Sequence, residues 1–195
     1  MMHRLMNGLA RYMALVGGFV LLALILLTCA SVLGRGINTF LHSELGIGLL
    51  GGMTRTLLDT GVGPILGDFE VVEAGIAFAI FAFIPFCQIT NGHATVDIFT
   101  AKLGVGANRF IQMVVEIVFA VVLILIAERL YDGMMSKMRY GETTFLLQFP
   151  IWWAYAISLS AAVLAAFVGV YMAVVRTAEF FTGRMIIAPA GGADH

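Results

Sequence analysis

Long apolar runs separated by short polar stretches dominate the chain. A helix rises 1.5 Å per residue and the hydrocarbon core of a bilayer is about 30 Å thick, so one crossing takes roughly 20 mostly apolar residues. Four stretches meet this requirement, and the pattern predicts transmembrane helices at about residues 12–34, 69–90, 108–128 and 150–175. We therefore expect an all-α integral membrane protein, with one four-helix membrane domain over residues 1–181 and a flexible tail over residues 182–195.

The third predicted span is the most polar of the set, because it carries Gln112 and Glu116. A carboxylate at the centre of a helix costs roughly 3 kcal/mol on insertion scales, whereas each Val, Ile or Phe around it contributes about 0.3 to 0.6 kcal/mol in favour of insertion. The long apolar run that ends at Ile126 outweighs the carboxylate. We expect this segment to span the membrane as well.

Two further amphipathic segments flank the first span. Near the amino terminus apolar residues recur at steps of three and four from Met2 to Met13, with His3 and Arg4 on the other side. This pattern predicts an amphipathic helix, either an arm along the inner leaflet or an extension of the first span into the headgroups. Residues 47–58 in the first outer connection predict a surface helix parallel to the membrane, because a dozen residues are too few to span it.

Composition and charge narrow the class of protein. Hydrophobic residues make up 61% of the 195 residues and charged ones only 12%, and the formal net charge is −1. Without a basic excess we expect no nucleic-acid partner. Lys and Arg are nearly balanced between the two sides, but Arg4 and Arg11 precede the first span, so we expect both termini inside. Cys29 and Cys87 lie at different depths, and we expect two packed, unpaired thiols.

Charged residues at the outer ends of the first two spans form one candidate site. Arg35 ends the first span, and Glu70 and Glu73 open the second at a similar depth. A guanidinium pairs bidentately with a carboxylate, so these residues predict an ion pair. The alternative is that each side chain reaches water by itself.

Polar residues on the second and third spans form another candidate site. Glu73 and Gln88 share one face of the second helix, and Arg109, Gln112 and Glu116 share one face of the third. Intramembrane polar groups are expensive and usually serve a function. No other ionisable residue lies between Glu116 and Glu128, so we favour an interhelical hydrogen bond over a proton relay.

The remaining motifs indicate anchoring and turns rather than catalysis. Trp152, Trp153 and Tyr155 open the fourth span, where aromatic residues anchor helices at headgroup depth; an ordinary aromatic belt and a partner contact are equally compatible with them. An inner turn follows the second span and contains Gly92, His93, Val96 and Asp97. The sequence has no metal-spaced Cys/His cluster, no nucleophile with a base and no histidine within an apolar core. We expect no catalytic site, no metal and no cofactor.

These motifs, in this order, resemble the small membrane subunit of TRAP transporters, the DctQ-like component of the tripartite ATP-independent periplasmic importers of bacteria and archaea. The resemblance covers most of the chain. It rests on Val32-Leu33-Gly34-Arg35, on Glu70 and Glu73, on the segment from Asn91 to Asp97, and on Gly141-Glu142 through Phe149-Pro150-Ile151-Trp152. The outer connection of residues 36–67 is longer than is usual in the family.

The resemblance implies a multi-pass protein of the cytoplasmic membrane and a set of partners. They are a large multispanning permease, which carries the substrate and sodium sites and moves like an elevator, a periplasmic substrate-binding protein, and membrane lipids. The small subunit would then be a scaffold, not an enzyme, in sodium-coupled uptake of an organic acid. Its contact surface with the permease would include Arg35, Glu70, Glu73, Gln88, Gln112 and Glu116. The alternatives are a membrane anchor of a redox enzyme that holds haem or quinone, and a self-sufficient small channel.

Overall fold

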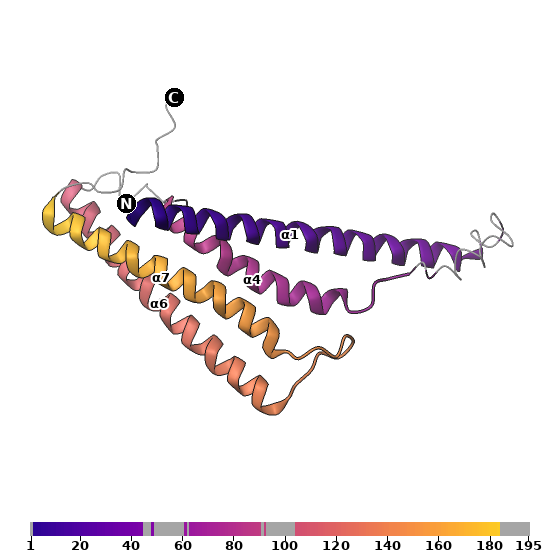
Figure 1. Cartoon of the computed structure of the whole chain (residues 1–195). Coiled ribbons are helices and arrows are strands. Elements are labelled where there is room, and N and C mark those ends of the chain that lie inside the picture. The colour runs from indigo at the N-terminus through magenta and orange to yellow at the C-terminus, as the bar shows by residue number, and fades with distance from the viewer. Residues whose placement is uncertain are drawn as a thin grey trace, which may run out of the picture.

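The computed structural model describes residues 2–44, 48, 61, 63–90, 92 and 104–183. Within these residues the chain forms four helices, α1 Met2–Leu41, α4 Asp68–Ile89, α6 Val105–Tyr140 and α7 Trp152–Thr182 (Figure 1). All of them are long and apolar enough to cross a membrane. The expected all-α membrane class is confirmed.

Helix α1 is continuous over 40 residues. The amphipathic residues at its start therefore extend the first span, and the structure has no break that would make them a separate arm. Helix α4 matches its predicted span to within a residue at each end and continues through Pro85. The surface helix expected at residues 47–58 and the tail after Gly183 lie outside the described residues.

Helices α6 and α7 both run past the predicted spans. Charged residues follow the apolar runs, and hydropathy therefore marks the edge of the bilayer rather than the end of the helix. Each extension contains an ion pair between residues one helical turn apart. The nitrogen–oxygen distance is 3.7 Å for Arg129 with Asp132 and 2.8 Å for Arg176 with Glu179. Each helix ends at a glycine in the left-handed region, which is the usual helix terminator.

The helices lie side by side in the order α1, α4, α7, α6. The last helix in sequence, α7, therefore lies between α4 and α6. Figure 1 shows that they converge at the end where α1 begins and spread apart toward the other end. We call the converging end inner and the spread end outer. The arrangement is an open row in which the two edge helices, α1 and α6, do not pack against each other.

Small residues let neighbouring helices approach closely. A Cβ on Gly17 would lie 2.8 Å from the Cβ of Ala82, and one on Gly75 would lie 2.7 Å from Leu24. On α7 the buried residues include four alanines together with Ser158 and Gly169. Close approach through Gly and Ala is typical of membrane helices, where packing rather than water exclusion drives association.

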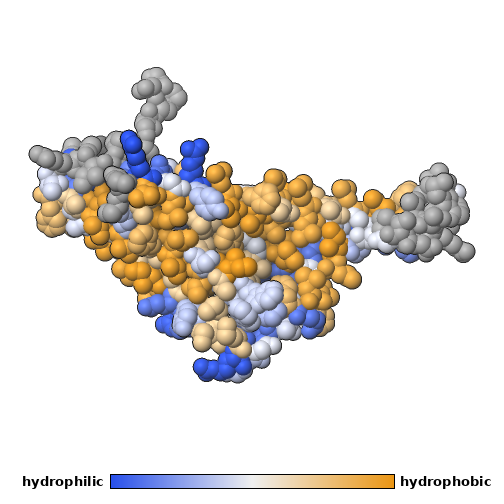
Figure 2. All heavy atoms as spheres, viewed as in Figure 1, coloured by the Kyte–Doolittle hydropathy of each residue, from blue (hydrophilic) through white to orange (hydrophobic). Residues whose placement is uncertain are grey.

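Most of the surface around the helices is apolar. Figure 2 shows hydrophobic residues over most of the visible face, with strongly hydrophilic ones concentrated toward helix ends. Large exposed side chains include Phe19 at 73% and Phe167 at 58%, as expected for helices that face lipid or another membrane protein. The thiols of Cys29 and Cys87 are unpaired, as expected, but Cys29 is exposed rather than packed, because it lies on a side of α1 that no other helix covers.

Candidate functional site

A hydrogen bond between α4 and α6 joins two of the predicted intramembrane residues. Nε2 of Gln88 donates to Oε2 of Glu116 at 3.1 Å. Gln88 is only 1% exposed, and it is covered by α7 at Gly169, where a Cβ would lie 3.3 Å from the amide nitrogen. The predicted interhelical hydrogen bond is confirmed.

The outer turn of α4 is held by the connection between α6 and α7, residues 141–151, which we call the strap. The carboxylate of Glu70 accepts the backbone N–H groups of Leu146 at 2.6 Å and of Leu147 at 2.9 Å. The side chain of Leu147 also packs directly against Gly67, just before α4 begins. Glu70 therefore ties the strap to a helix that is distant in sequence.

The strap is itself a hairpin. Thr143 and Pro150 form an isolated antiparallel bridge, the N–H of Thr144 donates to the carbonyl of Phe149 at 2.9 Å, and Nζ of Lys137 lies 2.6 Å from Oε2 of Glu142. These contacts hold the strap in the shape that presents two consecutive N–H groups to one carboxylate.

The predicted ion pair between Arg35 and the glutamates of α4 is absent from the described residues. Glu70 accepts hydrogen bonds from the strap, and neither Glu73 nor Arg35 takes part in an ion pair with another described residue. The expected similarity in depth was wrong, because Gly34 lies against Gly63 while Leu24 packs on Gly75, so Arg35 is level with the segment before α4 and lies beyond both glutamates. Glu73 and Arg35 are both exposed.

The aromatic residues for which the sequence predicts an interfacial belt stand at the start of α7. The rings of Trp152 and Trp153 meet edge to face with centroids 6.0 Å apart, and Trp153 is 52% exposed. Tyr155 instead packs against α6, where a Cβ on Gly133 would lie 2.7 Å from its ring. Tyr155 thus contributes to the packing of α7 on α6, whereas Trp153 is exposed.

The inner turn is described only in part. Gly92 follows the end of α4, and its N–H donates to the carbonyl of Cys87 at 2.8 Å. The other members of the predicted motif, His93, Val96 and Asp97, lie outside the described residues. Gln112 is exposed near the inner end of α6.

A buried charged pair that was not predicted from the sequence lies near the inner end of α7. Arg176 and Glu179 are each less than a tenth exposed, and Nη1 of the arginine lies 2.8 Å from the carboxylate. Their spacing of three residues on one helical face is the signal that would have shown the pair. A second inner contact runs from Arg109 of α6 to the carbonyl of Gly183 at 3.0 Å, so charged groups at this end serve helix packing.

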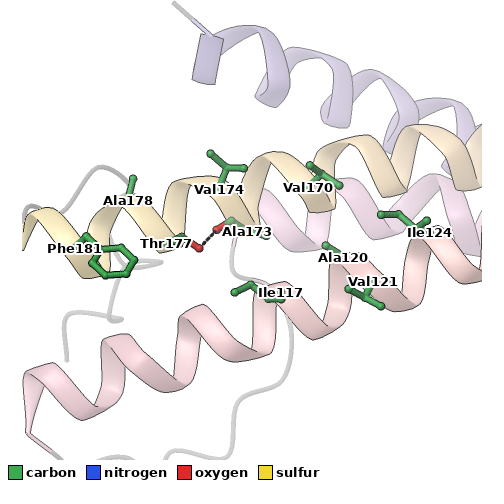
Figure 3. A pocket seen from close by; sticks show the side chains of 10 residues that line it. All are labelled: Ile117, Ala120, Val121, Ile124, Val170, Ala173, Val174, Thr177, Ala178 and Phe181. Carbon is green, nitrogen blue, oxygen red and sulfur yellow. Dashed lines mark hydrogen bonds between the residues drawn. The ribbon is translucent and has the colours of Figure 1, made fainter.

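A groove of about 500 Å³ runs between α6 and α7 on their inner halves (Figure 3). Its lining is apolar apart from Thr177, whose hydroxyl donates within α7 to the carbonyl of Ala173 at 2.7 Å. No histidine lines the groove. His3, one of the described histidines, stacks on Tyr171 at the inner end instead. Among the described residues no group of three or more His, Cys, Asp or Glu side chains comes together to hold a metal.

The comparison with known families identifies the family of the chain. Residues 24–179 match the family model described as tripartite ATP-independent periplasmic transporters, DctQ component. The chain belongs to the DctQ family. This DctQ protein is accordingly a small membrane component of a TRAP transporter, and the family is one of transporter components rather than enzymes. No curated protein and no solved structure matches the chain.

Proposed function

We propose that this DctQ protein is a static scaffold for the large permease subunit of its transporter. The observation that supports the proposal is the row of helices, which has only small shared cores and leaves broad apolar faces exposed. One face of such a row can cover a larger membrane protein while the other meets lipid. The permease then moves its substrate domain against a wide, fixed frame.

The polar groups of the described spans support a structural role. Gln88 is bonded to Glu116, Arg176 to Glu179 and Glu70 to the strap. The first bond joins α4 to α6, the second lies within α7, and the third holds the start of α4. We assign the solute and sodium sites to the permease, and the delivery of the solute, an organic acid, to the periplasmic binding protein.

We further propose that the contact surface with the permease lies among Arg35, Glu70, Glu73, Gln88, Gln112 and Glu116, and that both termini of the chain are on the cytoplasmic side of the inner membrane. The three residues with an intrachain bond, Glu70, Gln88 and Glu116, shape the helices that form this surface. The exposed ones, Arg35, Glu73 and Gln112, are available to a partner.

Reconstitution into lipid vesicles tests the scaffold directly. Vesicles that contain the permease with this chain should take up the organic acid when the binding protein and an inward sodium gradient are supplied, and vesicles with the permease alone should take up far less. Equal uptake with and without the chain would contradict a scaffold role. Uptake that does not depend on sodium would contradict the coupling.

A weaker proposal concerns the outer connection of residues 36–67. Its length motivates a contact with the binding protein, because long loops of compact domains often carry function. Deleting residues 46–62 should lower binding-protein-dependent uptake while the complex with the permease still assembles. Unchanged uptake by the assembled complex would remove the proposal.

A further inference from the structure

One carboxylate in the membrane-spanning part of α4 points away from every helix of the described chain. Glu73 is exposed, and it shares a face with Phe69, Ile76 and Ile80 at steps of three and four residues. These three neighbours are 74%, 42% and 55% exposed. The face of α4 that packs on α1, through Gly75 and Ala82, is on the opposite side of the helix.

The depth of Glu73 follows from the length of α4. This helix has 22 residues, or about 33 Å, which is close to the thickness of the hydrocarbon core. Glu73 lies five residues after the first residue of the helix, roughly 7 Å inside the outer end. The neighbouring Gly75 packs on Leu24 in the apolar run of α1, so Glu73 is level with apolar residues rather than with the polar end of that helix.

The chain has no donor for this carboxylate among its described residues. Glu70, one turn away, receives two N–H groups from the strap, and Glu116 receives the amide of Gln88. On α1, the hydroxyl of Thr28 donates to the carbonyl of Leu24 at 2.8 Å. Glu73 therefore differs from the other two glutamates in that its side chain takes part in no hydrogen bond or ion pair in the described residues.

We propose that the α4 face formed by Phe69, Glu73, Ile76 and Ile80 docks on a transmembrane helix of the large permease subunit, and that this helix presents an arginine or lysine to Glu73. A charge against hydrocarbon is expensive, and pairing it with a partner of opposite charge relieves the cost on both chains. The exposed apolar residues around Glu73 exclude water from the pair. This inference rests on the proposed scaffold function.

The groove between α6 and α7 is a poorer candidate for the same contact. Its lining contains no charged residue, so it accepts a lipid chain as readily as an apolar helix. The α4 face has a charge that only some partners satisfy, and charge complementarity is what selects one partner over another.

Co-purification of the large subunit with the tagged chain tests the pairing. The substitutions Glu73→Lys and Glu73→Leu should each lower the amount of permease recovered by roughly tenfold or more, because each leaves the partner's cation unpaired. Glu73→Gln should have a smaller effect, since its amide oxygen still accepts a hydrogen bond. The matched control is Glu128→Lys, the same change at an exposed position in the outer half of α6, and it should leave recovery unchanged.

The outcomes separate this inference from the function on which it rests. If the unsubstituted chain recovers no permease, the scaffold function itself fails. If the unsubstituted chain recovers the permease and the Lys and Leu substitutions recover as much, the docking inference fails and the scaffold function stands.

Photo-crosslinking covers the case in which a substitution harms folding. A crosslinking amino acid placed at Ile80 should attach to a transmembrane segment of the permease that contains an arginine or lysine. The same amino acid at Leu22 of α1, which is 54% exposed, should attach mainly to lipid. Attachment of Ile80 only to lipid, or to a second copy of this chain, would overturn the proposal.

Discussion

Glycine residues, which lack a Cβ, and glutamate carboxylates determine how the ends of the helices meet their neighbours. Gly34 of α1 lies directly against the backbone of Gly63, so a Cβ there would overlap the carbonyl oxygen of that residue. Two residues later Gly36 has open space around it. Both glycines stand in the same helix, but only one is required by packing.

The two glycines give a matched pair of substitutions. Gly34→Ala should destabilise the protein by about 1 to 3 kcal/mol, because the new methyl group meets backbone that cannot rotate away. Gly36→Ala should be neutral or stabilise by up to about 1 kcal/mol, since alanine favours a helix over glycine. Thermal unfolding in detergent measures both, and equal effects of the two substitutions would contradict the close approach of Gly34 to Gly63.

A double-mutant cycle tests the bond between α4 and α6. Gln88→Leu and Glu116→Leu should each lower stability, and the pair should show a coupling energy of about 1 kcal/mol, in the range measured for hydrogen bonds between membrane helices. Thermal or denaturant unfolding of the four proteins supplies the values. Additive losses would show that the two side chains act independently.

At this scale the sequence predicted some contacts and not others. Glu116 was expected to bond to another helix, because a carboxylate alone in an apolar span has few alternatives, and Gln88 is its partner. Arg35 was expected to pair with Glu70 or Glu73 and does not. Arg35 lies beyond the start of α4, because α1 continues outward past that point and Gly34 is level with Gly63. Glu70 instead binds backbone N–H groups of a distant segment, and no sequence pattern shows them.

At the scale of helices and connections, the strap is the element that the sequence described least. Gly141, one of the residues that carry the family resemblance, ends α6 in the left-handed conformation. The reach of the strap to Glu70 depends on the outer extension of α6, which hydropathy did not predict. The charged residues that follow Glu128 ended the expected span, although the helix continues to Tyr140.

Hydrogen exchange tests how the strap is held. Replacing Glu70 by Ala should speed amide exchange at Leu146 and Leu147, because both N–H groups lose their acceptor. Glu73→Ala removes the same charge one turn further along α4 and should leave exchange in the strap unchanged. Slow exchange at both amides in the Glu70→Ala protein would show that the hairpin alone protects them.

At the scale of the whole molecule, the number, order and type of the spans could be predicted from hydropathy alone, because the bilayer sets the length of each apolar run. The order of the helices in space could not. It depends on which small residues face each other, such as Gly17 with Ala82 and Gly169 with Ala120, and several glycines and alanines were equally suitable. The open row that results is the basis of the scaffold proposal.

The most direct test is purification of the tagged chain from its native membranes in a gentle detergent, followed by mass spectrometry of the proteins that remain bound. The scaffold account predicts recovery of a large multispanning permease in an amount equal to that of this chain. Recovery of the chain alone, or together with a redox enzyme, would contradict it.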